Sequence, residues 1–127
     1  MNRSRRSFLP SCLLPLILAA CTTAPLNEPR DVRFADPQVM PDERAAQILR
    51  AGTGLGWTMR RTAENLIQAS RQEGQRRALV AISFDAERFS IKRLDSTGFA
   101  YAAGEIELDF NRWVSDLKAA ILAQSSV

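Results

Sequence analysis

The first 21 residues constrain the fold more than any other segment, because they decide how much of the chain is left to fold. Three arginines lie within the first six residues, and an apolar run over residues 8–20 ends in two alanines. This is the layout of a secretory signal peptide. The apolar run is too short for a membrane span, which needs about 20 residues. Cleavage after residue 20 would leave 107 of the 127 residues, a length that suits one small domain.

The cysteine that follows this run gives the segment a more specific interpretation. Leu18-Ala19-Ala20-Cys21 resembles the lipobox of bacterial lipoproteins. The resemblance implies that the Cys21 thiol is alkylated with diacylglycerol and that a dedicated peptidase cuts before it. The alternative is an ordinary signal peptide with a chance cysteine. In lipoproteins that resemble this one, a residue other than Asp after the cysteine commonly directs the protein to the outer membrane. Thr22 therefore implies an outer-membrane anchor facing the periplasm, with the inner membrane as the less favoured location.

The export route has two interpretations. Ser4-Arg5-Arg6-Ser7-Phe8-Leu9 resembles the twin-arginine motif, which exports folded proteins. The Leu-rich core that follows suits the general secretory route equally well. The sequence leaves both routes open.

Removal of the signal peptide changes the cysteine and charge inventories. Cys12 leaves with the signal and Cys21 would carry the lipid, so no disulfide remains and the hydrophobic core alone must hold the fold. The signal holds three of the 17 basic residues and none of the 14 acidic ones, so the mature chain has 14 of each. Nucleic-acid binding needs concentrated Lys and Arg, and we do not expect it here.

Residues 21–40 are expected to be the lipidated cysteine and a flexible tether, because residues 22–40 contain three prolines and no sustained periodicity. The folded domain is then residues 41–127. A helix is predicted to begin at Pro41, which suits a first helical position, and to end near Gly52. Gly52, Gly54 and Gly56 lack the strand and the Gly-Lys-Ser/Thr of a phosphate-binding loop, so we interpret them as a helix stop and turn.

The middle of the chain predicts antiparallel strands. Residues 57–60 and 66–71 suggest two of them, and residues 78–94 alternate apolar and polar side chains around a polar turn at 85–88. This last stretch predicts a β-hairpin. Its expected core side chains are Val80, Ile82, Phe84, Phe89 and Ile91.

The C-terminal segment predicts a second helix. Asp109 suits an N-cap, and the residues after it place one apolar stripe at helical spacing. Together these patterns predict an α+β fold: a small antiparallel sheet of three to four strands with an N-terminal and a C-terminal helix packed on it. The stripe consists of Phe110, Trp113, Val114, Leu117 and Ile121.

The side chains of the mature chain offer little for catalysis. It has no histidine and no usable cysteine, which removes the common nucleophilic triads and zinc sites. Glu105 and Glu107 would share one face of an extended segment, but acidic residues are also favoured before a helix N-terminus. We therefore expect no enzyme activity, no cofactor and no metal.

Charge is balanced overall but not along the chain. Residues 57–94 hold eight basic and four acidic residues, whereas residues 95–127 hold two basic and five acidic ones. One interpretation is that basic sheet edges discourage aggregation. The other is an interaction surface for anionic lipid or an acidic envelope protein. The candidate interaction residues are Arg60, Arg61, Arg76, Arg77, Lys92 and Arg93.

The C-terminal stripe and the hairpin also carry a resemblance. The chain resembles a group of small uncharacterised proteobacterial lipoproteins over about residues 43–122. A histidine common before the hairpin strand in that group is replaced here by Arg76-Arg77, and the group brings no assigned activity. The matching pieces are Gly56-Trp57, residues 78–82, residues 89–91, Asp95-Ser96, and Asn111-Arg112-Trp113-Val114 with Leu117 and Ile121.

These observations lead to one expected function and two alternatives. We expect a lipid-anchored periplasmic domain that is a non-catalytic envelope accessory or interaction module, with Cys21 as the lipidated residue. The first alternative is a lipoprotein that binds a small ligand or peptide in a pocket between the sheet and the C-terminal helix, near Trp57, Tyr101 and Trp113. The second is a hydrolase that uses carboxylates.

Overall fold

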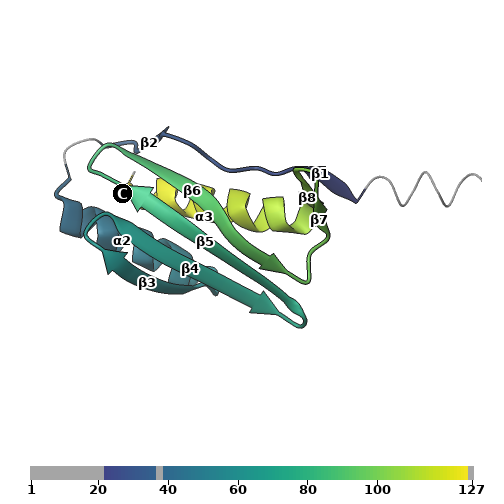
Figure 1. Ribbon diagram of the computed structural model, residues 1–127. Coiled ribbons are helices and arrows are strands. Elements are labelled where there is room, and N and C mark those ends of the chain that lie inside the picture. Colours follow the sequence, from purple (N-terminus) through teal and green to yellow (C-terminus); the bar gives the residue numbers. More distant parts are fainter. Residues whose placement is uncertain (1–21, 37–38, 126–127) are drawn as a thin grey trace, which may run out of the picture.

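A five-stranded antiparallel sheet forms the centre of the fold, and helices α2 and α3 lie on one of its faces (Figure 1). The computed structural model describes residues 22–36 and 39–125, so the expected signal peptide and Cys21 lie outside the described residues. The α+β class is confirmed. The predicted single sheet of three to four strands is wrong, because the described residues form two antiparallel sheets, of five and three strands.

The large sheet has the strand order β2-β6-β5-β4-β3. The predicted hairpin is β5 with β6, and its five predicted core side chains are between 0% and 5% exposed. Both strands are longer than expected: Arg76 and Arg77 extend β5, and Arg88 and residues 95–97 extend β6. The strands are Val32–Arg33 (β2), Thr58–Ala63 (β3), Leu66–Glu73 (β4), Arg76–Phe84 (β5) and Arg88–Thr97 (β6).

Helix α2 spans Pro41–Gly54 and begins at the predicted proline, with two acidic residues in its first turn. It continues two residues beyond the predicted end at Gly52. A Cβ atom built on Gly52 would lie 2.2 Å from Met59 Sδ, so this glycine lets β3 approach the helix closely. The turn after the helix is made instead at Gly56, which has a φ of +88°.

Helix α3 spans Leu108–Ser125, and its predicted apolar stripe is buried against the sheet and α2. Asp109 lies inside the first turn of this helix rather than before it. Its carboxylate binds Arg76 Nη1 at 2.9 Å and Arg112 Nη1 at 2.8 Å. The predicted N-cap residue therefore acts as the partner of two arginines.

A small sheet in the order β1-β8-β7 lies beside the first turn of α3 (Figure 1). The backbone N–H of Leu108 donates to Thr22 O at 3.0 Å, which joins β1 to the start of the helix. Ala103 and Gly104, in the turn between β7 and β8, both have positive φ, as tight hairpin turns often require. The strands are Thr23–Pro25 (β1), Tyr101–Ala102 (β7) and Glu105–Glu107 (β8).

Residues 22–36, which we call the N-terminal strap, lie along the domain, so the predicted flexible tether is wrong for this segment. Strand β1 pairs with β8 and strand β2 pairs with β6. Between them, the carbonyl of Pro29 accepts a hydrogen bond from Ile91 N at 2.9 Å. Proline lacks an N–H but keeps its carbonyl, so it is tolerated at the edge of a sheet. The prolines that suggested a tether are compatible with this edge position.

The strap is also bound to α3 along the length of the helix. Near the start of α3, Asn111 Oδ1 accepts from Asn27 N and Asn111 Nδ2 donates to Pro25 O, both at 2.9 Å. At the end of α3, Ser125 Oγ accepts from Ala35 N at 3.2 Å. Figure 1 shows the strap running along one edge of the domain from β1 to β2.

Candidate functional site

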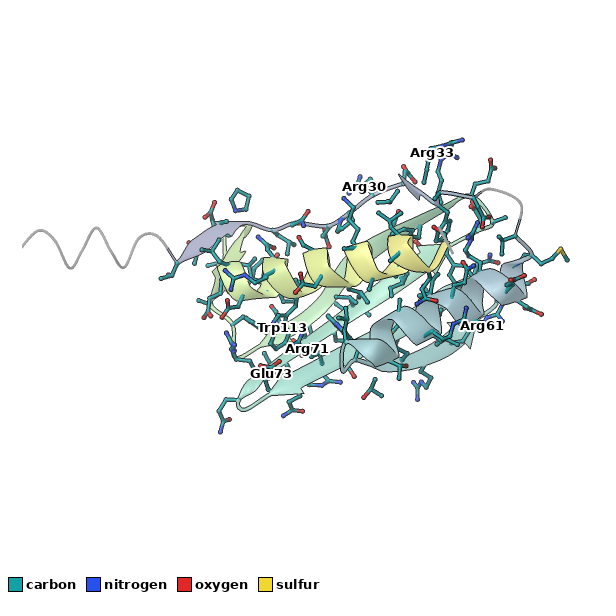
Figure 2. All side chains as sticks on the ribbon, turned by 180° about the vertical axis from the view of Figure 1, so that it is seen from behind. Arg30, Arg33, Arg61, Arg71, Glu73 and Trp113 are labelled. Carbon is teal, nitrogen blue, oxygen red and sulfur yellow. The ribbon has the colours of Figure 1, made fainter. Side chains whose placement is uncertain are left out.

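The face of the large sheet turned away from the helices is the broadest candidate surface. Figure 2, seen from behind, shows α2 and α3 in front of the sheet, so neither of the described helices lies on the opposite face. Cross-strand partners share a face of a sheet. The register therefore places Arg60, Gln68, Ala81 and Lys92 in one row across β3, β4, β5 and β6. We call this surface the open face.

The neighbouring row is polar as well. It contains Thr58, Ser70, Leu79 and Asp95 from the same four strands. Arg77, on the same side of β5, lies 3.6 Å from the Asp95 carboxylate. A shallow depression of about 230 Å³ is formed between the two rows, lined by Thr58, Arg60, Gln68, Ser70, Arg77 and Leu79.

A second depression lies where the strap crosses the edge of the open face. Its volume is about 230 Å³, and its charged lining residues are Arg30, Lys92 and Glu28. Figure 2 shows Arg30 and Arg33 along this edge. Arg33 is paired with Arg88 in the β2-β6 ladder, so the basic surface extends to the edge strand β2.

The six predicted interaction residues are divided between the two faces. Arg60, Arg77 and Lys92 lie on the open face. The other three lie on the helix side, where each contacts a neighbour: Arg61 Nη1 is 3.0 Å from Asp42 Oδ1, Arg76 binds Asp109, and Arg93 lies over Tyr101 with 3.9 Å between its guanidinium carbon and the ring centroid.

The helix-side arginines border an aromatic cluster. The Phe99 ring packs edge-to-face on Trp113, with 5.1 Å between ring centroids. Arg71 lies over the Trp113 ring at 4.3 Å and is bound to Glu73, and Figure 2 shows these three side chains together. Such cation–ring contacts cover the rim of the core and contribute about 0.5–1 kcal/mol each at exposed sites.

Ion pairing also shifts pKa values on this side. The side-chain hydrogen bond from Arg76 holds the pKa of the Asp109 carboxyl below its usual value. The same bond raises the pKa of the Arg76 guanidinium. The pair is therefore charged throughout the physiological range. It joins β5 to the start of α3.

The alternative ligand pocket was expected near Trp57, Tyr101 and Trp113. The two tryptophans are 3% and 6% exposed, and their rings pack edge-to-face at 6.5 Å. Tyr101 lies in the small sheet and is 41% exposed. In this part of the structure the space between the sheet and α3 is filled by rings. The open face therefore offers more accessible surface than this region.

Glu105 and Glu107 lie on one extended strand, β8, as the sequence suggested. Each carboxylate has partners of its own. Glu107 Oε1 accepts from Ala100 N at 2.8 Å, and Glu107 Oε2 is 3.7 Å from Arg76 Nη1. Glu105 Oε1 is 3.5 Å from the Thr23 hydroxyl oxygen. These contacts hold the small sheet together.

Sequence reasoning missed Arg44, a completely buried arginine of α2. Its guanidinium donates to Ala86 O, Asp36 O and Gln47 Oε1, and it lies 3.7 Å from the centroid of the Phe34 ring. Burial lowers the pKa of the guanidinium, which remains charged. A signal was present in the sequence, because position 44 lies four residues before the buried Ile48 and so on the same helix face.

No family model matches the chain, and comparisons with curated proteins and with solved structures give no match. Neither helix described in residues 39–125 is long and apolar enough to cross a membrane. Within the described ranges, no three acidic side chains are grouped so that they could hold a metal ion.

Proposed function

We propose that the chain is a lipid-anchored periplasmic protein of the outer membrane that acts without catalysis, by binding an acidic partner protein of the cell envelope through the open face. Cys21 is the lipidated residue in this proposal. The observation that carries the binding part is the basic character of a sheet face that no helix covers.

The charge of the open face supports an acidic partner. Its strands carry Arg60, Arg77, Lys92 and, towards β2, Arg88 and Arg33, against the carboxylate of Asp95, and at its edge the strap adds Arg30 and Glu28. Complementary charge across an interface raises the rate of association and selects partners. The excess of cations on this face contrasts with the balanced charge of the mature chain.

The shape of the open face supports a protein rather than a small molecule. Its two depressions have a volume of only about 230 Å³ each, and most of the lining residues are polar or charged, with Leu79 in one depression and Pro29 and Ile91 in the other. Small-molecule sites are usually concave and mostly apolar. A protein partner can cover a flat surface of alternating cations and hydroxyls and bond to many of them at once.

The test is crosslinking and pull-down of the tagged full chain from membranes. The test variant is Arg60→Glu with Lys92→Glu. Its matched control is Arg50→Glu with Lys118→Glu, which makes the same charge change on α2 and α3. We expect the test variant to lose a partner that the native chain and the control both capture. Capture by all three proteins would refute the role of the open face.

A separate comparison tests the anchor. Cys21→Ala should remove the lipid adduct from the N-terminal peptide and release the protein from the membrane fraction. If Cys21→Ala stays in the membrane fraction and the N-terminal peptide of the native chain carries no lipid adduct, the lipoprotein assignment is refuted. If no variant captures any protein, the binding-module assignment is refuted.

A further inference from the structure

The start of the described chain is fixed to one end of the domain. Thr22 O accepts a hydrogen bond from Leu108 N at 3.0 Å, and the next residue, Thr23, is paired with Glu107 in the β1-β8 ladder. Consecutive Cα atoms are about 3.8 Å apart, so the attachment point at residue 21 is adjacent to this end of the domain. A lipid on Cys21 would therefore hold the domain directly, with no slack in residues 22–36.

The end of the domain nearest this attachment point exposes an uncharged surface. Residues 100–104 read Ala-Tyr-Ala-Ala-Gly, and all five are exposed in and around the turn between β7 and β8. Tyr101 is 41% exposed and Leu108, in the first turn of α3, is 40% exposed. We call residues 100–104 and Leu108 the anchor-end tip. Tyrosine is enriched at membrane–water interfaces because its ring is apolar and its hydroxyl is polar.

Two of the three carboxylates next to the tip are paired with arginines, and the third, Glu105, is exposed and lies 3.5 Å from the Thr23 hydroxyl oxygen. Asp109 is paired with Arg76 and Arg112, and Glu107 lies 3.7 Å from Arg76. Arg93 lies over the Tyr101 ring, and the Arg112 side chain is 67% exposed. Each cation near an anionic bilayer surface adds about 1 kcal/mol of attraction.

A depression beside the attachment point supports the same conclusion. Its volume is about 270 Å³, and next to the first described residue its lining contains one leucine, one arginine and two carboxylates that are both paired with arginines. Leu108 offers apolar surface there, and Arg112 offers a donor for a lipid phosphate. The lining residues are Thr22, Glu107, Leu108, Asp109 and Arg112.

We infer that the anchor-end tip lies on the surface of the phospholipid bilayer, with Tyr101 in the headgroup region, so that the domain stands on this end. The inference rests on the proposed lipidation of Cys21. The two acyl chains of diacylglycerol suffice for stable anchoring, so contact of the tip with the bilayer sets the orientation of the domain rather than its attachment.

This orientation has a consequence for the rest of the molecule. Helix α3 has 18 residues and begins at the tip, so the other end of the domain stands about 27 Å further from the membrane. Strands β5 and β6 span the same distance, because their connecting turn at 85–87 is at the far end, where Ala86 O binds Arg44 of α2. The open face is then presented sideways and is accessible to a partner in the periplasm.

The test uses the full chain, purified in its lipidated form and reconstituted in vesicles of phosphatidylethanolamine and phosphatidylglycerol. A fluorophore is attached to Ala102→Cys at the tip or to Glu87→Cys in the turn between β5 and β6, which is the matched control. Some lipids carry a spin-label quencher at the headgroup. We expect the lipid-bound quencher to reduce the fluorescence of the label at 102. The label at 87 should be quenched no more than it is by the same quencher free in solution.

A third protein separates contact of the tip from mere proximity. A flexible Gly-Ser insertion of about ten residues between Cys21 and Thr22 keeps the lipid but supplies slack. If the tip has its own affinity for the bilayer, the label at 102 remains partly quenched, and Tyr101→Ser in the same chain abolishes that remainder. If the fixed attachment alone holds the tip down, the insertion abolishes quenching, and the surface affinity of the tip is refuted.

The mass of the N-terminal peptide distinguishes the two ways of failing. An N-terminus without a lipid adduct would overturn the proposed anchoring, and this inference with it. A lipid adduct together with equal fluorescence of the labels at 102 and 87 would overturn the inference alone.

Discussion

Replacing Arg44 by methionine tests how the strap is joined to the helical layer. The Arg44 side chain is completely buried and donates four hydrogen bonds: two to Ala86 O, at 3.2 and 2.6 Å, one to Asp36 O at 2.5 Å and one to Gln47 Oε1 at 2.9 Å. Methionine keeps much of the volume and removes every donor. The three acceptors are then left without this partner in a part of the structure that water reaches poorly.

The expected cost follows from these contacts. Hydrogen bonds to a charged group are worth about 1.5–3 kcal/mol each, but bonds made by one side chain are not additive. Removing one partner of a buried charged network costs about 3–5 kcal/mol. We therefore expect Arg44→Met to lose about 3–5 kcal/mol of unfolding free energy. For a domain of this size, that loss lowers the Tm by at least about 12 °C.

The assay is urea denaturation of residues 22–127, followed by the fluorescence of the two buried tryptophans. The matched control is Arg50→Met on the exposed side of the same helix, where the arginine binds Gln124 Oε1 at 3.3 Å. The control should stay within about 0.5 kcal/mol of the native protein. An unfolding free energy for Arg44→Met within about 1 kcal/mol of the native value would refute the reasoning. An unaffected Arg44→Lys would show that a point charge suffices and the planar fork is not needed.

Three further predictions concern single residues. Gly52→Ala should lower the unfolding free energy in urea by about 1–3 kcal/mol, because the new Cβ would overlap Met59. Its control, Gly54→Ala, meets open space and should be neutral or stabilise the domain by up to about 1 kcal/mol. Equal effects of the two substitutions would contradict the close packing of Gly52. Asp85 accepts two backbone N–H bonds that lower the pKa of its carboxyl, so its contribution to stability is full above the ordinary pKa of 3.8 and is lost as the pH falls through the folded pKa. Asp85→Asn should therefore be less stable than the native protein at pH 6 and approach its stability in acid. A constant difference in unfolding free energy across that pH range would refute this. Asn111→Asp keeps the oxygen that accepts from Asn27 N but loses the N–H that donates to Pro25 O. This should lower the unfolding free energy by about 1–2 kcal/mol and speed amide hydrogen exchange in residues 23–27. Unchanged exchange there would mean that the strap is held by other contacts.

Local periodicity predicted the parts of the fold that are long and amphipathic. The hairpin of β5 and β6 and the stripe of α3 repeat their patterns often enough to be recognised, and residues such as Ile82 and Trp113 are buried as expected. The limits of α2 were harder to predict. A glycine at position 52 suggested the end of the helix, yet Gly52 lies inside α2 and leaves room for Met59 of β3. The sequence predicted a strand at residues 57–60 but not that it packs against this glycine.

The strap and the small sheet were beyond such reasoning. Strands β1, β2, β7 and β8 have two or three residues each, too few to show a period of two. They are stabilised by pairing with residues far along the chain, as Thr23 is paired with Glu107. The proline content of the strap pointed to a tether because composition gives no information on such distant partners. Asn111 likewise has no local feature that indicates its two bonds to the strap.

The division of the candidate interaction residues, in contrast, could have been predicted. The six cations are three adjacent pairs, at positions 60/61, 76/77 and 92/93, and adjacent residues of a strand point to opposite faces. Each pair therefore had to give one cation to each face. For two of the pairs the sequence also indicated which member lies on the helix side, because Arg76 and Arg93 alternate in phase with the predicted core residues Val80 and Ile91.

The candidate cations on the helix side and those on the open face therefore have different roles. On the helix side, Arg61 and Arg76 meet carboxylates of α2 and α3, so part of the acidic excess after residue 95 is neutralised within the fold. The cations on the open face have Asp95 as the only carboxylate among the described strand residues that share their face. Residues 22–127, which hold 14 basic and 14 acidic side chains, thus form one basic surface, because internal pairing takes up acidic groups. If a partner binds there, reversing Arg60 should weaken its binding without unfolding the domain, whereas reversing Arg76 should destabilise the domain first. Equal stability of the two variants in urea denaturation would contradict this division.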